Sequence, residues 1–354
     1  MIAGLGRCLV IAPQGLGDAL EATPLIAALK DAGAAVDVAV LRPGPRELFE
    51  GLTDVVDRVM YLPYWQGGLG PFLASIVQHA RKRRYNASFL AYPASRPEYQ
   101  MLSWAFGALV RVAHAYWRPT LTNLLGLNTV LVPVASDTHN VLRNLHLLHA
   151  IGITSESSSD YLVPPSWRQR AQEPGLLAFH IGTVTHHGLE AKRWPRESFS
   201  QLASRMIKRR YAVHFIAGPD EREATRKLVA EVEGSSLFEG RLPEVARFLS
   251  SATAAVTNDS GIGHLAAAVG TPVLALHGPT PVEGGPFGPE AVRFRPSPCP
   301  ACFDPRLRNT RCALDIDFAC LKRDMPVEIV EHRLMALLQA IERDHSHFSS
   351  PEGR

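Results

Sequence analysis

The clearest indication of the fold comes from residues 7–41, which read RCLVIAPQGLGDALEATPLIAALKDAGAAVDVAVL. The apolar run Arg7–Ala12 predicts a buried strand, and the glycines in residues 15–18 allow a tight turn after it. Ala19–Ala32 places apolar residues at helical spacing, and Val36–Leu41 predicts a second strand. A strand, a helix and a strand in this order form one βαβ unit, the seed of a parallel doubly wound sheet.

The same alternation continues outward from this unit along the first half of the chain. Residues 153–174 then interrupt it as the expected linker region, because Ser155–Pro165 within them is rich in Ser and Pro and carries little hydrophobic pattern. Further elements of the first half are expected as strands at Val55–Leu62, Ala87–Ala91 and Thr129–Val132 and as helices at Leu69–Arg84 and Tyr99–Tyr116.

The alternation restarts after the linker, so the fold class is α/β with two Rossmann-like domains, residues 1–165 and 166–354. Their sheets are expected to face a cleft at the carboxyl ends of the strands, where ligands bind. The terminal helix is expected either to stay with the second domain or to pack back on the first. The expected strands are Leu176–Ile181, Ala212–Ala217, Ala254–Thr257 and Pro272–His277, and the expected helices are Arg196–Arg210, Asp220–Glu233, Leu242–Ser251, Gly261–Val269 and Val327–Arg343.

Composition excludes several classes of protein. The 354 residues are 46% hydrophobic and 20% charged, which argues against a disordered chain, a coiled coil and a collagen-like repeat. The formal charge is +3 and neither half is strongly basic, so no nucleic-acid partner is expected. No run reaches the ~18 apolar residues of a membrane span, and the N-terminus lacks the apolar region of a signal peptide. A cytoplasmic location is therefore expected.

Asp18 lies at the expected start of the first helix, directly after Gly15 and Gly17. An aspartate at this position can simply cap the helix. The positive end of a helix also keeps a carboxylate ionised at neutral pH, which a general base requires. The loop is not a dinucleotide fingerprint, because its third glycine is missing.

Thr183 and Lys192 flank a polar loop, Val184–Ala191, between a predicted strand and a predicted helix. Backbone amides, threonine hydroxyls and the ammonium group of Lys192 would suit a phosphate ligand. The alternative is a solvated loop with incidental basic residues. Two adjacent histidines in the loop do not make a metal site, because no third ligand is evident, and we expect no catalytic metal.

The segment NDSGIGH, residues 258–264, follows a strand and opens an alanine-rich helix. Its small residues would let a ligand phosphate approach the free amides of the first helical turn. The alternative is a well-capped buried helix in which the histidine is a core residue. The candidate binding residues of this segment are Asp259, Ser260, Gly261 and His264.

Asp220 and Glu221 follow the strand Ala212–Ala217. An acidic side chain at the end of a strand can accept hydrogen bonds from ribose hydroxyls in nucleotide folds. An acidic residue that complements the helix dipole explains the pair equally well.

Four of the five cysteines gather near the C-terminus, at Cys299, Cys302, Cys312 and Cys320. The first pair has the spacing of a zinc knuckle, but the second pair does not repeat it. In a chain of this size without a signal peptide they are free thiols or ligands of a structural zinc ion.

A basic run, Arg81–Arg84, ends one of the predicted helices. A solvated helix end explains it. Contact with anionic lipid or with a phosphorylated sugar is the alternative, with Trp104, Phe106 and Trp117 as neighbouring anchors in the sequence.

Taken in order, these motifs resemble those of the bacterial heptosyltransferases of glycosyltransferase family 9. The resemblance runs from Val10 to about Leu338. It rests on GLGD at residues 15–18 with TPL at 23–25, KRWP at 192–195, and NDSGIGH at 258–264 with GTP at 270–272 and GPT at 278–280. The cysteine segment is similar to that of a subgroup that adds the second heptose.

The resemblance implies a GT-B architecture with the acceptor mostly on the first domain and the nucleotide-sugar donor mostly on the second. It implies inverting transfer of a heptose, or a related sugar, from an ADP-sugar to the inner core of lipopolysaccharide. A lipid-linked acceptor would make the protein peripheral to the cytoplasmic face of the inner membrane. The resemblance implies that Asp18 is the base, that Lys192 binds the donor diphosphate and that Asp259 lies at the donor sugar or the reacting centre. It places Ser260, Gly261 and His264 at phosphate and Asp220 or Glu221 at the ribose.

Two other functions stay open at this point. One is a nucleotide-sugar epimerase or isomerase of the same architecture, which would not need an acceptor-side base such as Asp18. The other is a nucleotide-sugar-binding protein without catalytic activity, which would bind ADP and be indifferent to the change Asp18→Asn.

Overall fold

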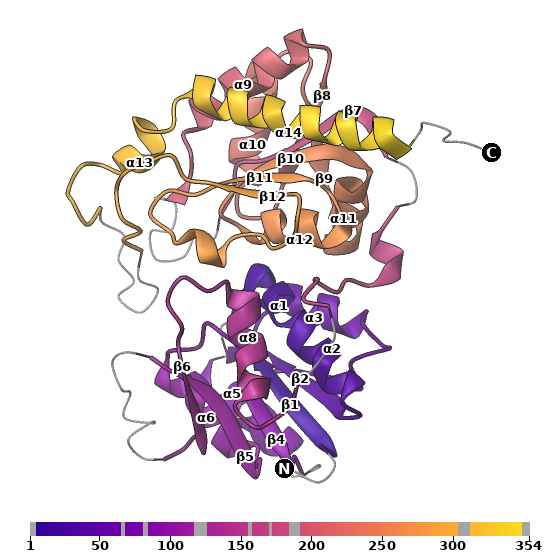
Figure 1. Cartoon of the computed structure of the whole chain (residues 1–354), viewed down its shortest axis with the longest axis vertical. Helices are drawn as coiled ribbons and strands as arrows, with labels where there is room; N and C mark the ends of the chain where they lie inside the picture. Colours follow the sequence, from indigo (N-terminus) through magenta and orange to yellow (C-terminus); the bar gives the residue numbers. More distant parts are fainter. Residues whose placement is uncertain are drawn as a thin grey trace. The chain divides into compact units, whose positions relative to one another are not determined.

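The computed structural model describes residues 5–64, 68–80, 84–116, 126–154, 158–169, 172–183, 192–303 and 312–348. The chain forms two compact units, Met1–Pro165 and Ser166–Arg354 (Figure 1). The division falls inside the stretch expected to be a linker, beside the short helix η1 (Pro165–Trp167).

The first unit is built on a sheet of six parallel strands in the order β3-β2-β1-β4-β5-β6. The predicted βαβ unit is confirmed, since β1 pairs with β2 from Arg7 opposite Ala35 to Ala12 opposite Val40. The strands are β1 (Arg7–Ala12), β2 (Ala35–Val40), β3 (Arg58–Tyr61), β4 (Ala87–Leu90), β5 (Val110–Ala115) and β6 (Val130–Pro133).

Helices cover both faces of this sheet. A core cluster on one face includes Phe72 of α5 and Leu102 of α6 together with Leu9 and Ile11 of β1. The other helices contribute nothing to that cluster and contact one another instead, α8 with α1 and α2 and α1 with α3. The helices are α1 (Leu16–Glu21), α2 (Thr23–Asp31), α3 (Pro43–Glu50), α5 (Leu69–Ala80), α6 (Pro97–Ala105) and α8 (Asn140–His149).

The single helix predicted for Tyr99–Tyr116 is wrong. Helix α6 ends at Ala105, and Gly107 then adopts a left-handed φ of +67° that stops the helix. The following residues form β5, which pairs with β4 and β6. Pairing on both sides buries the β-branched residue Val112 in the sheet, and this outweighs the helical spacing of the sequence.

The second unit has a sheet of six parallel strands in the order β12-β11-β10-β7-β8-β9. Counted within the unit, this is the same strand order as in the first sheet, the order of Rossmann folds. The strands are β7 (Glu173–His180), β8 (Ala212–Ala217), β9 (Ser236–Glu239), β10 (Ala252–Asn258), β11 (Val273–Leu276) and β12 (Ala291–Phe294). The helices are α9 (Arg196–Lys208), α10 (Arg222–Glu231), α11 (Leu242–Ser251), α12 (Gly261–Val269), η3 (Val282–Gly284), α13 (Ala319–Lys322) and α14 (Val327–Phe348).

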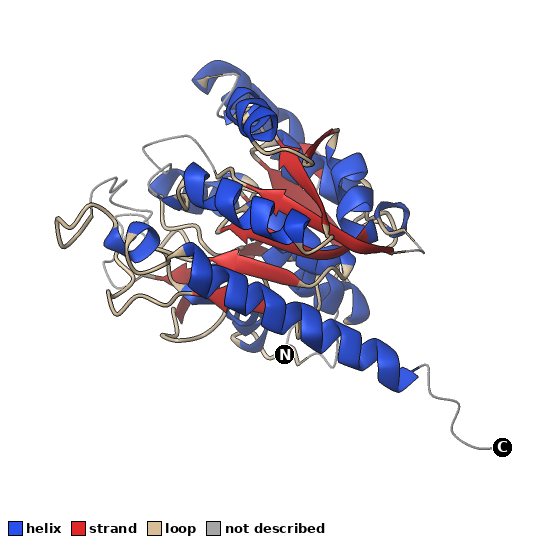
Figure 2. Ribbon diagram, turned by 90° about the horizontal axis from the view of Figure 1, so that it is seen from above, coloured by secondary structure: helices blue, strands red, loops and turns tan. Residues whose placement is uncertain are grey.

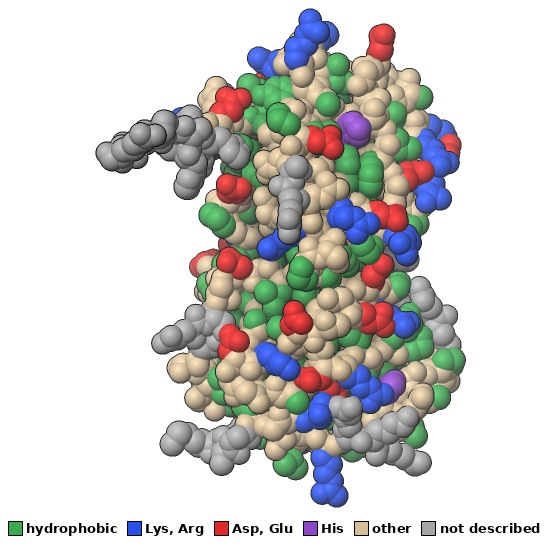
Figure 3. Space-filling view, turned by 90° about the vertical axis from the view of Figure 1, so that its right-hand side faces the viewer, with side chains coloured by type: hydrophobic (Ala, Val, Ile, Leu, Met, Phe, Trp, Pro, Cys, Tyr) green, Lys and Arg blue, Asp and Glu red, His purple; other side chains and the backbone are tan. Residues whose placement is uncertain are grey.

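Figure 2 shows helices on either side of the strands and the long helix α14 that leads to the C-terminus. Val330 and Leu334 of α14 lie in the core of the second unit with Phe199 of α9. The terminal helix therefore stays with the second unit. On the face of the molecule drawn in Figure 3, acidic and basic side chains are interspersed.

Each sheet has a point where the strand order reverses, between β1 and β4 in the first and between β7 and β10 in the second. Connections leave such a point in opposite directions, which opens a crevice at the carboxyl ends of the strands. Asp18 follows β1, whereas His180 and Asn258 end β7 and β10. The predicted polar motifs thus follow strands at the reversal points.

Candidate functional site

Asp18 lies in the first turn of α1, which starts immediately after the β1 loop. Gly15 is the N-cap, and its N–H donates to Asp18 Oδ2 at 3.2 Å. The carboxyl group is partly exposed, so it caps its own helix and still meets solvent. Asn140 of α8 donates to the Glu21 carboxylate at 3.0 Å, which fixes the other end of this short helix.

In the second unit, Asn258 joins the ends of two strands to the loop that follows. Its side-chain amide donates to Ile181 O at 2.8 Å, and its Oδ1 accepts the N–H of Trp194 at 2.8 Å. The Trp194 indole is buried against Phe199 and donates to Met325 O at 2.8 Å. These contacts fix the backbone close to Lys192.

Lys192 and Asp259 form an ion pair at the end of β10. Lys192 Nζ lies 2.7 Å from Asp259 Oδ2 and 5.0 Å from the centre of the Phe303 ring. Burial by itself raises the pKa of Asp259, but the positive charge and hydrogen bond of Lys192 outweigh this effect, so the net pKa lies well below its usual range. The carboxylate is therefore ionised and the lysine is held in place before any ligand arrives.

His277 is a site residue that sequence reasoning missed, because it lay at the end of the predicted strand Pro272–His277 with no motif of its own. Its side chain is fully buried, and burial lowers its pKa although Asp259 opposes this effect. Within the described residues its Nε2 has no hydrogen-bond partner. A neutral imidazole with an open nitrogen beside Lys192 and Asp259 is a further polar group at this site.

A chain of hydrogen bonds joins three strand ends. Glu221 Oε1 lies 2.9 Å from His180 Nε2 and accepts the N–H of Gly218 at 3.0 Å. His180 Nδ1 lies 3.2 Å from Ser260 Oγ. An ionised carboxylate only accepts, so His180 Nε2 donates its hydrogen to Glu221. The chain therefore fixes Ser260, the N-cap of α12.

Glu221 is committed to this internal network. It is 8% exposed, and a Cβ added to Gly182 would lie 2.5 Å from its carboxylate, so the backbone closes tightly around it. Asp220 next to it is exposed. Of the two residues that the sequence left open, Glu221 is therefore held in the interior and Asp220 is exposed.

The remaining predicted residues lie close along the chain to this cluster. Gly261 begins α12, and His264 lies one turn into the helix and is 4% exposed. Thr183 follows β7, is 7% exposed, and accepts a hydrogen bond from Arg193 through its carbonyl at 3.1 Å. The predicted polar loop Val184–Ala191 lies outside the described residues.

The hydrogen bonds of Glu221 allow a prediction of how the free energy of unfolding depends on pH. Burial raises the pKa of Glu221, but the hydrogen bond and charge of His180 and the Gly218 N–H lower it to a net value below normal. A carboxyl group with a lowered folded-state pKa stabilises the protein above its unfolded pKa and loses this contribution as the pH falls through the folded value. We expect Glu221→Gln to lower the free energy of unfolding at pH 7 by about 2 kcal/mol.

Urea denaturation at a series of pH values from 8 to 3 measures this effect. The difference between wild type and Glu221→Gln should stay constant down to the ordinary pKa of a glutamate and shrink below it. Glu197→Gln is the matched control, because this carboxylate is exposed and 3.8 Å from its partner Arg196, and we expect no change there. A difference that is constant with pH would contradict the assigned charge.

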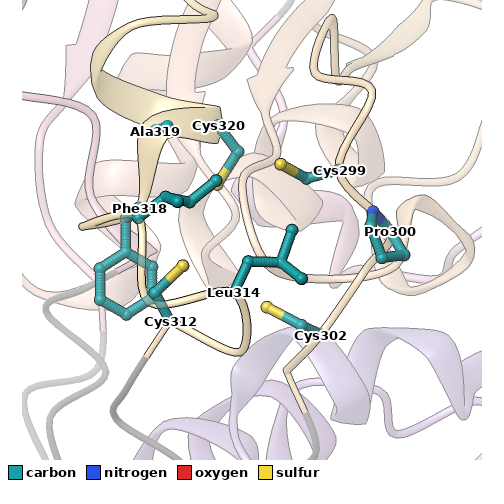
Figure 4. A pocket seen from close by; sticks show the side chains of 9 residues that line it. Cys299, Pro300, Cys302, Cys312, Leu314, Phe318, Ala319 and Cys320 are labelled. Carbon is teal, nitrogen blue, oxygen red and sulfur yellow. The ribbon is translucent and has the colours of Figure 1, made fainter.

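The four C-terminal cysteines line one small pocket together with Leu314, Ile316 and Phe318, and all are free thiols (Figure 4). No group of three or more His, Cys, Asp or Glu side chains in the described part of the chain is arranged to hold a metal ion. The structure therefore gives no support to the predicted zinc site, although it confirms that the four cysteines gather.

The thiols of this pocket differ in their expected reactivity. Burial raises the pKa of Cys320 to about 11, and repulsion from the neighbouring thiolates adds to this effect. Cys8, which does not line the pocket, is also buried, and burial raises its pKa to about 11. Burial also raises the pKa of Cys312, but the backbone N–H groups of Ile316 and Phe318 and their neighbours outweigh it and lower the pKa below normal.

We expect iodoacetamide at pH 7.5 to alkylate Cys312 well before Cys320 and Cys8, because the thiolate is the reactive form. Mass spectrometry of peptides from timed samples measures the order. The same reaction in guanidinium chloride is the control, since all five thiols of the unfolded chain should then react at similar rates. Alkylation of Cys8 before Cys312 in the folded protein would contradict the pKa order.

The fold and the polar clusters at its strand ends define a class: two doubly wound α/β units of the kind that bind nucleotides where the strand order reverses. The sequence model of glycosyltransferase family 9 (heptosyltransferase) matches residues 102–310. The chain belongs to this family.

Among its relatives, lipopolysaccharide heptosyltransferase 1 of Pseudomonas aeruginosa is 34% identical over 205 residues, which cover 55% of this chain and 56% of the relative. The chain thus spans about half the length of this curated relative. Lipopolysaccharide heptosyltransferase 1 of Salmonella typhimurium is 25% identical over 77% of this chain and 89% of its own length.

Solved structures agree on the fold. The glycosyl transferase family 9 protein of Veillonella parvula aligns with a TM-score of 0.71 over 96% of this chain and 99% of its own, at 18% identity. E. coli heptosyltransferase WaaC with ADP-2-deoxy-2-fluoro heptose aligns with a TM-score of 0.70 over 93% and 99%, also at 18% identity. The predicted GT-B type of two Rossmann-like units is confirmed.

Proposed function

We propose that this chain transfers a heptose from ADP-heptose to the inner core of lipopolysaccharide with inversion at the anomeric carbon. The observation that carries the proposal is the buried Lys192–Asp259 pair beside the N-terminus of α12, in a member of glycosyltransferase family 9. The names of the Pseudomonas and Salmonella relatives support the reaction, and the ADP-heptose analogue in the E. coli structure supports the donor.

On the acceptor side, Asp18 is the proposed general base. Its carboxylate takes the proton from an acceptor hydroxyl while the oxygen attacks the anomeric carbon of the donor. The helix start that carries Asp18 stabilises the ionised form, and the Gly15 N–H directs one of its oxygens.

On the donor side, the bond between the anomeric carbon and the diphosphate breaks, and ADP leaves with the extra negative charge. Lys192 meets this charge, and the amides of Ser260 and Gly261 at the start of α12 add further donors, with His264 on the same turn. Asp259 holds Lys192 until the diphosphate competes for it. Protein groups supply the positive charge, so the proposal includes no requirement for a divalent metal.

The acceptor is proposed to be attached to lipid, which places the enzyme at the cytoplasmic face of the inner membrane as a peripheral protein. Among the described residues, no helix is both long enough and apolar enough to span a bilayer. Thr183 is proposed at the phosphates and Asp220 at the ribose.

A binding panel tests the donor first, with ADP, UDP, GDP, CMP and their sugar conjugates measured by calorimetry with and without EDTA. We expect ADP and ADP-heptose to bind selectively and equally well in EDTA. A transfer assay with heptose-free lipopolysaccharide then tests the reaction. Preference for UDP, or conversion of the donor sugar with no acceptor present, would overturn heptose transfer and favour an epimerase. Binding of ADP-heptose without any turnover would favour a nucleotide-sugar-binding protein without catalytic activity.

A further inference from the structure

The charge of the first unit is concentrated in one part of the sequence. Residues 58–136 contain eight Lys or Arg and one Asp or Glu, whereas the whole chain contains 37 and 34. The single acidic residue, Glu98, lies 2.6 Å from Arg96 in an ion pair. The segment is therefore strongly cationic in a chain that is nearly neutral.

The same segment exposes large apolar side chains on α5 and α6. Leu73 and Val77 lie one turn apart on α5 and are each 49% exposed. Met101 and Trp104 lie one turn apart on α6 and are 48% and 56% exposed, and Leu109 beyond that helix is 73% exposed. Single exposed apolar residues are ordinary, but four on these two helices and a fifth just beyond α6 indicate a surface that contacts something else.

The two helices lie on the same side of the first sheet. Phe72 of α5 and Phe106 at the end of α6 belong to one core cluster. Tyr64 joins the helices, because its ring packs 4.9 Å from that of Phe72 and its hydroxyl donates to Glu98 at 3.5 Å. Since both helices bury one side in this cluster, their outer sides face away from the same face of the sheet.

A cation lies at the edge of this surface. The N–H of Leu109 donates to Tyr85 O at 3.1 Å, so Leu109 lies beside the exposed residue Arg84 where β4 and β5 begin. Tyr85 in turn packs edge-on against Phe106 at 6.3 Å. Arg84 is the last residue of the basic run Arg81–Arg84.

We infer that this surface, formed by Leu73, Val77, Met101, Trp104, Leu109 and Arg84 and called here the α5–α6 face, docks on an anionic lipid bilayer. Apolar side chains enter the boundary between headgroups and acyl chains, and tryptophan prefers that depth. Arginine side chains extend to the lipid phosphates. The positive charge of the segment favours an anionic bilayer over a neutral one and over a second copy of the same cationic surface.

The inference rests on the proposed function, since a lipid-borne acceptor gives the enzyme a reason to reach a membrane. Arg84 and Leu109 lie where strands of the first sheet begin, whereas Asp18 follows the carboxyl end of β1. Docking through the α5–α6 face therefore leaves the proposed base uncovered within the first unit.

Cosedimentation with lipid vesicles tests the docking without any turnover. The full chain is mixed with vesicles of phosphatidylcholine alone or with phosphatidylglycerol added, and the bound fraction is measured at low and high salt. We expect binding to anionic vesicles only, weakened by salt. Trp104→Ser with Leu109→Ser, and separately Arg84→Glu, should each lower the partition coefficient about tenfold.

Leu142→Ser is the matched control, because this leucine is 38% exposed on α8, on the other face of the sheet, and we expect it to bind vesicles like wild type. Circular dichroism and ADP binding confirm that each variant is folded. The inference would be overturned if the protein bound neutral and anionic vesicles equally, or if the double variant bound vesicles like wild type. It would also be overturned if wild type bound no vesicles but formed a dimer that the double substitution dissociates. ADP binding and heptose transfer to a soluble acceptor fragment are measured separately, so failure of docking is distinct from failure of the proposed function.

Discussion

Asp18→Asn is expected to lower kcat of heptose transfer by about 10²–10⁴-fold, the usual contribution of a general base. Asparagine keeps the size of the side chain and an oxygen that can accept the Gly15 N–H, so the start of α1 is retained. It cannot take a proton from the acceptor. We expect the affinity for ADP and the melting temperature to stay close to wild type, because the proposed donor residues lie in the second unit.

The change has a close structural counterpart that serves as its control. Glu244 occupies the same N3 position in α11 and accepts the Arg241 N–H at 2.7 Å, as Asp18 accepts the Gly15 N–H. Glu244→Gln removes a capping charge of the same kind from an exposed helix start, and we expect its turnover to equal that of wild type. Turnover within a factor of two of wild type in Asp18→Asn would remove Asp18 from the mechanism.

Lys192→Met is expected to abolish measurable ADP binding and to lower the free energy of unfolding by about 3 kcal/mol, because it leaves a mostly buried carboxylate without its main cation. Without Lys192 the pKa of Asp259 should rise, since the charge that lowers it most is gone. The loss of stability should therefore diminish at acidic pH, where Asp259 takes a proton. Calorimetry of ADP binding and urea denaturation measure the two effects.

A double variant separates the structural role of Lys192 from its binding role. Lys192→Met with Asp259→Asn removes both charges, so we expect most of the lost stability to return while ADP binding stays absent. Lys227→Met is the control, because this lysine is 64% exposed and 3.4 Å from Glu223 on the surface of α10. Tight ADP binding by Lys192→Met would show that the diphosphate is held elsewhere.

Much of the fold could be predicted because apolar periodicity and turn residues are local signals. The helices Leu242–Ser251 and Gly261–Val269 have the predicted boundaries. The edge strands β9 and β12 could not be predicted, because each has only four residues. Most of their side chains are partly exposed, so they show almost no hydrophobic pattern. Strand β5 was mistaken for helix because its burial depends on its pairing with β4 and β6.

In the candidate site, too, local motifs could be predicted from the sequence, whereas contacts that depend on strand pairing could not. Asp259 and Lys192 could be proposed from motifs, and the structure brings them within 2.7 Å. The involvement of His277 could not be predicted, because its place depends on β11 lying next to β10 in the sheet. The hydrogen bond between Glu221 and His180 likewise could not be predicted, because it joins residues that are 41 positions apart.

The two sheets share one strand order, and each unit closes a hydrophobic core of its own. Mutations that reshape one core need no compensation in the other, so the halves can diverge at different rates. Under the proposed function, selection for a new acceptor can act on residues 1–165 while residues 166–354, proposed to bind the activated sugar, are conserved. A lineage that changes the sugars on its surface can in this way alter the half proposed to bind the acceptor and retain the other half.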